Sequence, residues 1–321
     1  MSIYSTDWSI IIMLLIAQTI PLIKGAGKKE KIISLCLPKR MSYNRLIFRK
    51  ITDLRFLIMP TVLITGASSG IGKALALVYA SHQHALLLTG RDEDALNQVA
   101  QKCRQYSVEV FIYAKDLCLP DAVQSLMKFI EEKQLKIDLL INNAGAGCYR
   151  NFSEIPFDSL EQMLRVNIDG LVKLTRQLLP SMIKQGKGSI VNIGSVYSFV
   201  PVASQAVYAA SKAFVKSFSL GLQAELKKTG VSVSCVFPGS TESAFRARAG
   251  VVSDSKRFTL PSTIVAYKIY QGVKRKRLFI IPGWYNWLFV FLIQYVPIFW
   301  LPKIINFLAY RMRRIEKKPS N

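Results

Sequence analysis

The stretch Thr61-Val-Leu-Ile-Thr-Gly-Ala-Ser-Ser-Gly-Ile-Gly72 places a short apolar run directly before a glycine-rich turn, and a helical pattern follows from Lys73 to Ser81. A strand that passes through glycines into a helix can turn tightly and bring its backbone close to a pyrophosphate at the helix N-terminus. A lone glycine triad is only a moderate signal. The spacing of Gly66, Gly70 and Gly72 therefore predicts a dinucleotide-binding turn that needs support from other motifs.

The chain after this turn alternates apolar runs with helical stretches. We expect strands at 62–64, 85–88, 108–113, 137–141, 189–193, 231–237 and 277–281. We expect helices at 73–81, 92–104, 120–134, 157–184 and 205–228. Strands that are bounded by turns and alternate with helices predict an α/β fold with a doubly wound, parallel, seven-stranded sheet.

Further motifs stand in a fixed order near the ends of the expected strands. Asn142-Asn-Ala-Gly145 ends the fourth strand, Asn167 lies in the helix that follows, and Ser195 ends the fifth strand. Tyr208-Ala-Ala-Ser-Lys212 and Pro238-Gly239 come after them. Together with the TGxxxGxG turn, this ordered set resembles the short-chain dehydrogenase/reductase family over roughly residues 59–283. The resemblance implies a Rossmann-type sheet and an oxidoreductase.

Tyr208 and Lys212 are four residues apart in a helical stretch, so their side chains lie on one face. A free tyrosine has a pKa of about 10, too high for easy proton exchange near neutrality. A lysine ammonium one turn away and an oxidised nicotinamide ring both favour the phenolate, so we expect the pKa of Tyr208 to be lowered. An isolated YxxxK pattern is usually an ordinary helix face, but here it stands in register with the other motifs.

The resemblance implies a role for each member of a catalytic set. Tyr208 is the proton donor or acceptor, and Lys212 also holds the nicotinamide ribose. Ser195 hydrogen-bonds the substrate oxygen, so Ser195 and Tyr208 are the expected substrate contacts. Asn167 is expected to anchor a water that links Lys212 to solvent. Tyr197 could be mistaken for the proton donor, but no lysine follows one turn later and we expect it to line the pocket.

The end of the second expected strand indicates the cofactor. An Asp or Glu there usually holds the ribose 2′-hydroxyl of NAD, but this chain reads Thr89-Gly90-Arg91. An arginine guanidinium suits a 2′-phosphate, so we expect NADP(H). Asp92 and Glu93 are expected to start the next helix instead, where acids favour the dipole.

The expected cofactor-binding set combines this position with the motifs above. Asp116-Leu117 resembles the family's adenine contact, with an ordinary loop Asp near a helix start as the alternative. The full set is Gly66, Ser68, Ser69, Gly70, Ile71, Gly72, Arg91, Asp116, Leu117, Asn143, Ala144, Gly145, Tyr208, Lys212, Pro238, Gly239 and Thr241. Thr241 and Ser243 are candidate donors to the nicotinamide carboxamide, and Glu242–Leu260 is the expected substrate lid.

The first 58 residues allow two interpretations. An uncharged run from Trp8 to Ile23 is marginal for a membrane span, and four lysines follow it, which would keep the rest on the cytoplasmic side. It does not resemble a cleaved signal peptide because no basic segment precedes it. The alternative is that Met59 is the natural start and that 1–58 is an over-extended reading frame.

The C-terminal part is uncharged from Leu278 to Pro302 and contains three of the four tryptophans. Prolines interrupt it, so we expect residues 284–321 to form an interfacial or re-entrant membrane-binding extension rather than a span. The basic tail from Arg311 to Lys318 would add attraction to anionic lipid. The alternative is that the segment packs on its own domain or on a dimer partner.

Composition restricts the class of partner. The formal net charge is +23, and most of it lies in the two hydrophobic ends, which favours a membrane surface over nucleic acid. Five scattered cysteines indicate neither a disulfide framework nor a zinc site, and His82 and His84 have no third ligand in sight, so we expect no metal.

The sequence thus predicts an NADP(H)-dependent, membrane-associated enzyme with its catalytic domain, 59–283, on the cytoplasmic side. It would interconvert a ketone and a secondary alcohol on a lipophilic substrate such as a 3-ketosphingoid, a 3-oxoacyl chain, a steroid or an acylglycerone. Membrane-associated lipid reductases of the family look like the nearest relatives. We expect a homo-oligomer, a dimer or a tetramer. The alternative is a non-catalytic NADPH-sensing or scaffold protein, which could lose Tyr208 without harm.

Overall fold

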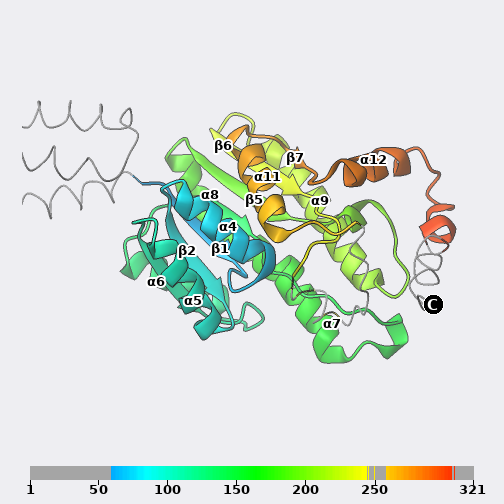
Figure 1. Ribbon diagram of the computed structural model, residues 1–321, viewed down its shortest axis with the longest axis horizontal. Helices are drawn as coiled ribbons and strands as arrows, with labels where there is room; N and C mark the ends of the chain where they lie inside the picture. Colours follow the sequence, from blue (N-terminus) through cyan, green and yellow to red (C-terminus); the bar gives the residue numbers. More distant parts are fainter. Residues whose placement is uncertain (1–58, 244, 246–248, 250–257, 306, 308–321) are drawn as a thin grey trace, which may run out of the picture. The chain divides into compact units, whose positions relative to one another are not determined.

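One sheet organises the part of the chain that the computed structural model describes, which is residues 59–243, 245, 249, 258–305 and 307 (Figure 1). Its seven parallel strands run in the order β3-β2-β1-β4-β5-β6-β7. They are β1 (Thr61–Thr65), β2 (Ala85–Gly90), β3 (Val110–Ala114), β4 (Ile137–Asn142), β5 (Gly188–Ile193), β6 (Val231–Val236) and β7 (Phe279–Ile280). The predicted seven-stranded parallel sheet is confirmed.

Helices cover both faces of this sheet. They are α4 (Gly70–Ser81), α5 (Glu93–Arg104), α6 (Ala122–Glu132), α7 (Phe157–Leu164), α8 (Leu171–Lys184), α9 (Ala206–Glu225), α11 (Ser262–Lys274) and α12 (Trp284–Ile293). Alternate residues of a strand point to opposite faces. Val62 and Ile64 of β1 therefore pack in one core with α4, α5 and α11, whereas Leu63 packs in a second core with α6, α8 and α9. Burial on both faces explains why the strands read as continuous apolar runs.

The strand order positions the site. The chain builds β1, β2 and β3 outward in one direction, then crosses back so that β4 lies on the other side of β1. Loops leaving the carboxyl ends of β1 and β4 therefore diverge, and open α/β sheets bind ligands in the crevice at such a switch point. β1 ends at Thr65 and β4 ends at Asn142, so the predicted motifs that follow these residues lie at the switch point.

Three elements differ from the prediction. The single helix expected at 157–184 is divided into α7, a π-helical turn η4 (Arg165–Gly170) and α8. The seventh strand is only two residues long. Helix α11 was not predicted. Its buried face consists of only Val265, Ala266, Ile269 and Gly272, which gives a weak helical pattern in the sequence.

The C-terminal apolar run forms α12, which packs one face on the domain. Asn286, Val290 and Ile293 are buried, and Ile293 joins a small core with Val200 and Val202. Packing on the domain, the alternative interpretation, therefore holds for this face. The other face is exposed: Trp284 is 76% and Trp287 55% accessible. Among the described residues, no helix is both long and apolar enough to cross a bilayer. The expected 1–58 segment and the basic tail lie outside the described residues.

Candidate active site

The glycine-rich turn is closely packed between β1 and α4. Gly66 has a φ of +64°, a backbone conformation that residues with a β-carbon rarely adopt. A β-carbon there would also lie 2.9 Å from Ala144 Cα. A β-carbon on Gly72 would lie 2.2 Å from the Gly66 carbonyl oxygen. The first glycine thus permits the turn and the last lets the helix start directly against it. Gly72 acts by packing rather than by facing the crevice.

Thr65 and Asn143 tie the ends of β1 and β4 together. Thr65 Oγ1 accepts hydrogen bonds from the backbone amides of Asn143 and Ala144, each at 2.9 Å. Asn143 Nδ2 donates to the Thr65 carbonyl oxygen at 2.8 Å. These bonds hold the two diverging loops in a fixed relation at the switch point. Asn142 is bonded deeper in the sheet, to Thr175 and Asn192.

Arg91 stands at the end of β2, where the cofactor prediction placed it. Its Nη1 lies 3.7 Å from Asp116 Oδ2, and its side chain is 52% exposed. A pair this long and this exposed contributes little stability, so the guanidinium can exchange partners. Asp116 Oδ1 also accepts from the Cys118 amide at 2.9 Å. Asp92 caps α5 by accepting from the Ala95 amide, as expected for an acid that starts a helix.

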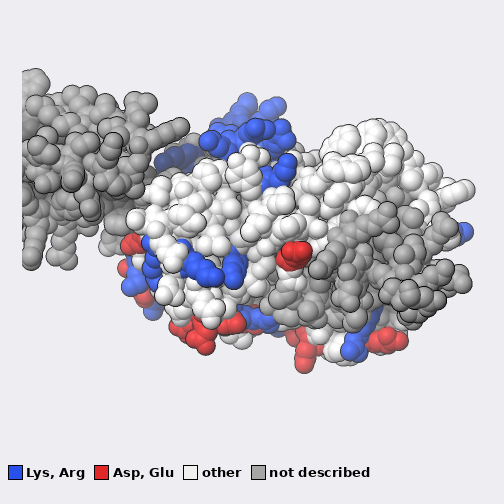
Figure 2. All heavy atoms as spheres, in the orientation of Figure 1, with Lys and Arg blue, Asp and Glu red and all other residues white. Residues whose placement is uncertain are grey.

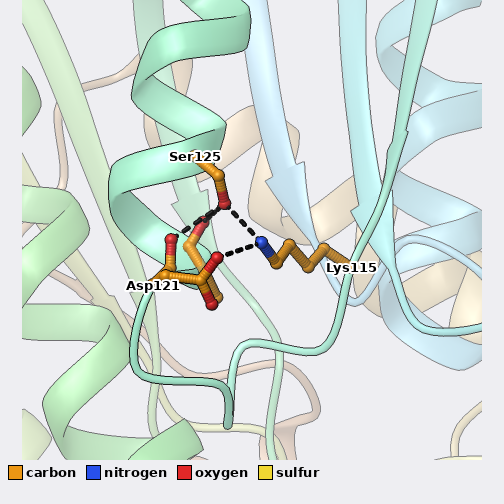
Figure 3. Close-up of polar contacts among 4 residues, drawn as sticks. Lys115, Asp121 and Ser125 are labelled. Carbon is orange, nitrogen blue, oxygen red and sulfur yellow. Dashed lines mark hydrogen bonds and ion pairs between the residues drawn. The ribbon is translucent and has the colours of Figure 1, made fainter.

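Lys115 is a second basic residue beside this position, but its ammonium is directed to α6 (Figure 3). Its Nζ lies 2.7 Å from Ser125 Oγ and is paired with Asp121. The hydrogen bond with Asp121 raises the pKa of Lys115 and keeps the charge engaged. Arg91 is therefore better placed than Lys115 to meet a phosphate at the end of β2.

Ser195, Tyr208 and Lys212 come together between β5 and α9. The Ser195 side chain faces the Tyr208 phenol, where it acts to lower the pKa of that phenol. Ser195 Oγ also accepts from the Tyr197 amide, which begins the 3-10 turn η5 (Val196–Phe199). Lys212 is 5% exposed and its Nζ donates to the Ile193 carbonyl oxygen at 2.8 Å. The same Nζ lies 5.8 Å from the centroid of the Tyr208 ring.

Asn167 reaches this group from the π-helical turn. Its Oδ1 accepts from the Ala146 amide at 2.8 Å, and its Nδ2 donates to the Ala146 carbonyl oxygen and to Ser211 Oγ. Protein partners thus occupy both Nδ2 hydrogens and one lone pair of Oδ1. A β-carbon on Gly145 would lie 3.5 Å from Asn167 Oδ1 and 3.6 Å from Lys212 Nζ, so Gly145 separates the two side chains. On the Asn167 side chain, the second lone pair of Oδ1 remains for the predicted water.

The electrostatics of Tyr208 differ from the prediction. Burial raises the pKa of the phenol above its usual range, and the hydrogen bond with Ser195 offsets only part of this effect. The expected lowering by Lys212 is therefore wrong for the protein groups alone, because Lys212 bonds Ile193 instead of the phenol. Burial also lowers the pKa of Lys212 to about 8. Each group is held toward its neutral form because each has lost its hydration.

These groups line a cavity of about 1210 Å³. It is bordered by most of the residues predicted to bind cofactor or substrate: Gly66, Ser68, Ser69, Gly70, Ile71, Arg91, Asp116, Leu117, Asn143, Ala144, Gly145, Ser195, Tyr208, Lys212, Pro238, Gly239 and Thr241. Gly72 and Asn167 lie behind the wall rather than in it. Tyr197 lines the cavity, as expected.

The sequence prediction missed the apolar end of this cavity, where Tyr149, Val202, Ala203, Phe245, Ala249 and Phe258 join the lining. Phe245 packs against Tyr208 with 5.7 Å between ring centroids. Position along the chain was the available signal, because 146–149 follow β4 and 202–205 directly precede α9. Most of the expected lid, Glu242–Leu260, lies outside the described residues.

The loop after β6 is held by α12. A β-carbon on Gly239 would lie 2.2 Å from Asn286 Oδ1, and Asn286 Nδ2 donates to the Pro282 carbonyl oxygen at 2.6 Å. Tyr285 donates from its hydroxyl to the Phe258 carbonyl oxygen at 2.9 Å. Helix α12 therefore touches two segments that line the cavity. Sequence patterns gave no sign of these contacts.

Among the described residues, no group of three or more His, Cys, Asp or Glu side chains could hold a metal ion. His82 instead packs on Tyr270, with ring centroids 4.0 Å apart.

Comparisons with known proteins agree with this geometry. Residues 60–251 match the short chain dehydrogenase family. An uncharacterized oxidoreductase of Staphylococcus aureus is 34% identical over 215 residues, which are 67% of this chain and 91% of that protein. A short-chain dehydrogenase from Sphingobium yanoikuyae, solved in complex with NADPH, superposes with a TM-score of 0.66 at 30% identity, covering 82% of this chain and 97% of that one. A bulky-bulky ketone specific alcohol dehydrogenase from Comamonas testosteroni gives 0.63 at 28% identity, covering 82% and 96%.

Proposed function

The chain belongs to the short-chain dehydrogenase family, and from that premise we propose that it interconverts a ketone and a secondary alcohol with NADP(H). The observation that carries the proposal is the convergence of Ser195, Tyr208 and Lys212 in a cavity that the glycine-rich turn also lines. A turn and a reactive group separated by one continuous cavity fit a dinucleotide that extends from one to the other.

The residues present fit NADP(H). The turn from Gly66 to Gly70 would bind the pyrophosphate at the start of α4, where backbone amides can donate to it. Arg91 would bind the 2′-phosphate at the end of β2. Gly90 leaves no acid to hold a free 2′-hydroxyl. Asn143, Ala144 and Gly145 would pass beside the adenosine, and Pro238, Gly239 and Thr241 would lie beside the nicotinamide. When bound, the cofactor supplies or accepts the hydride.

Tyr208 would donate a proton from its hydroxyl to the substrate oxygen, or take it back in the reverse direction. Ser195 would hydrogen-bond the same oxygen and orient it toward the phenol. Lys212 would bind the ribose beside Tyr208, and its charge would favour the phenolate when its pKa permits protonation. Asn167 would hold the Ala146 backbone and, through its remaining lone pair, a water next to Lys212.

A lipophilic substrate is supported by the far end of the cavity. Tyr149, Val202, Ala203, Phe245 and Ala249 offer apolar or aromatic surface beside Tyr208. Pockets of this composition bind ligands mainly through apolar contact, with few polar groups to fix orientation. The similar enzyme from Comamonas testosteroni is a bulky-bulky ketone specific alcohol dehydrogenase. The same class of substrate suits the wide apolar end here.

We also retain the membrane-associated extension as part of this proposal. On α12 and the turn after it, Trp284, Trp287, Phe291, Tyr295 and Trp300 are exposed. Aromatic side chains of this kind partition to the water–lipid boundary. The extension would bring the catalytic domain to its lipid substrate on the cytoplasmic side. A homo-oligomer stays a prediction, to be tested by light scattering.

The direct test is NADPH consumption by the purified full-length protein with a panel of ketones in detergent. Long-chain and polycyclic ketones should be reduced with a higher kcat/KM than short ketones of the same carbonyl reactivity. A preference for short, polar ketones would refute the lipophilic class. The absence of turnover with every ketone, despite NADPH binding, would favour the sensing protein instead.

A further inference from the structure

A strongly basic surface lies at the opposite end of the strands from the cavity. Figure 2 shows its side chains gathered at the upper edge of the view, above β5, β6 and β7 of Figure 1. It consists of exposed residues at the ends of α8 and α11 and in the turns that precede these three strands: Lys184, Lys187, Lys227, Lys228, Lys274, Arg275, Lys276 and Arg277. We call this set the basic turns.

The three turns are close neighbours. A β-carbon on Gly230, after α9, would lie 1.9 Å from the carbonyl oxygen of Gly186, after α8. Ser234 Oγ in β6 donates to the Arg277 carbonyl oxygen at 2.7 Å, which ties the third turn to the second. Eight cations therefore share one edge of the domain instead of being scattered over the surface.

Few acids balance this charge. Within the described residues, the basic turns form one ion pair, between Lys187 and Asp138 at 3.7 Å. Basic residues in the last turn of a helix favour the helix dipole, which explains Lys184 and Lys274. Lys227, Lys228 and the run from Arg275 to Arg277 lie beyond their helices. Helix stability therefore accounts for only part of the cluster.

The basic turns and α12 lie along the same edge of the domain (Figure 1). Edge strand β7 connects them: Arg277 stands before it and Trp284 begins α12 after it. Phe279 of β7 is itself 41% exposed. A row of cations followed by exposed aromatic side chains matches a bilayer, in which anionic head groups lie beside the apolar boundary.

We propose that the basic turns and the exposed face of α12 form one docking face for an anionic lipid surface. The inference rests on the membrane association proposed above and not on the proposed reaction. It adds a second point of contact that belongs to the catalytic domain itself. Two points of contact would fix the orientation of the domain, with the β7 edge against the lipid and the α12 end of the cavity close to it.

Binding of the full-length protein to phosphatidylcholine vesicles, with and without phosphatidylserine, tests this face. Combining Lys274→Glu, Arg275→Glu and Lys276→Glu should weaken binding to anionic vesicles at low salt by at least about tenfold, because each cation near such a surface contributes about 1 kcal/mol. High salt should reduce the difference between variant and wild type.

A matched control changes the net charge equally away from the β7 edge. Lys102→Glu, Lys128→Glu and Lys173→Glu replace exposed lysines on α5, α6 and α8. This triple should weaken binding by less than about threefold, since surface attraction falls off within a Debye length. The corresponding Gln variants of the basic turns should give a smaller loss than Glu. Equal losses from the two Glu triples would overturn the proposal, because bulk charge would then explain the binding.

Two further outcomes separate this inference from the proposed function. Trp287→Ser with Phe291→Ser tests α12 alone; if it abolishes binding while the basic-turn variant binds normally, the membrane association stands and the docking role of the turns fails. If the basic-turn variant instead loses self-association by light scattering and keeps its vesicle binding, the face joins two copies of this chain. Ketone reduction in detergent should be the same in every variant as in the wild type. If the wild type itself reduces no ketone, the proposed reaction fails while the vesicle results still decide the docking face.

Discussion

The Asn286 carboxamide packs directly on the α-carbon of Gly239, so that a β-carbon at Gly239 would lie 2.2 Å from Asn286 Oδ1. Asn286 is 7% exposed and belongs to α12, whereas Gly239 belongs to the loop that closes one wall of the cavity. A helix that was expected to serve lipid binding thus also supports the loop proposed to contact the nicotinamide.

Gly239→Ala should destabilise the fold by about 1–3 kcal/mol, because the new methyl group has no room beside Asn286. The free energy of unfolding in guanidinium measures this. Gly221→Ala is the matched control: nothing lies within 4 Å of its β-carbon, and it sits inside α9, so it should be neutral or stabilising. Adding Asn286→Ala to Gly239→Ala should recover part of the loss, as expected for residues in contact. Independent, additive effects would contradict the contact.

Tyr208→Phe should lower kcat by about 10²–10⁴-fold while leaving the Kd for NADPH nearly unchanged, because the ring stays and only the proton donor is lost. Tyr197→Phe removes a hydroxyl from a neighbouring ring, 6.4 Å away between centroids, in the same cavity. It should keep most of the activity. Steady-state kinetics with a ketone that the wild type reduces test this role. A Tyr208→Phe enzyme that retains more than about a tenth of kcat would exclude Tyr208 as the proton donor.

Arg91→Ala should reduce the preference for NADPH over NADH by ~1.5–3 kcal/mol, as for a hydrogen bond to a charged group. Fluorescence titration with both cofactors gives the two Kd values. Lys115→Ala should change the preference far less, because Asp121 and Ser125 hold that ammonium. If wild-type protein binds the two cofactors equally, or if Lys115 proves the more important residue, the cofactor assignment fails.

Lys212 should make stability depend on pH. Its pKa is lowered from 10.5 to about 8 in the folded protein, so the unfolded chain takes up the proton first as the pH falls, and stability is lost between these values. Below pH ~8 the loss is complete, at about 3 kcal/mol. The free energy of unfolding of Lys212→Met minus that of wild type should therefore fall by about 2 kcal/mol from pH ~7 to ~9.5.

The comparison is confined to that window because the raised pKa of Tyr208 acts in the opposite direction at higher pH, where the unfolded phenol would ionise first. The exposed Lys184→Met variant provides the control and should show a flat difference. A flat difference for Lys212→Met would mean that burial does not perturb this ammonium.

The parts of the fold that follow from local chemistry were predictable. The stretch from Thr65 to Gly72 predicts a strand end, a turn and a helix start, because glycines are required where one backbone segment lies directly against another. Arg91 and Asp92 could be separated into a ligand and a helix cap because each has its own local preference. Tyr208 and Lys212 share a helix face by spacing alone.

The remainder depends on contacts between distant segments. Asn286 meets Gly239 only because β7 brings α12 back to the end of β6. Lys115 lies beside the end of β2, but its ammonium is held by Asp121 and Ser125, a contact that no local sequence pattern indicates. For the same reason, the sequence did not show that burial raises the pKa of Tyr208 in the protein alone, since spacing gives the distance to Lys212 but not the loss of hydration that both groups share. The effect of an oxidised nicotinamide stays a prediction.

The π-helical turn at Arg165–Gly170 has a consequence for how the site can change. Such a turn accommodates one residue more than an α-helix of the same length, so α8 is rotated by about 100° from the phase that α7 would have imposed. Asn167 owes its inward direction to that extra residue. Deleting a single amino acid here would let α7 and α8 fuse into one regular helix and carry position 167 away from Ala146, with the sheet left intact. A substitution at position 167 therefore changes which side chain enters the site, whereas the direction of that side chain depends on the length of the turn.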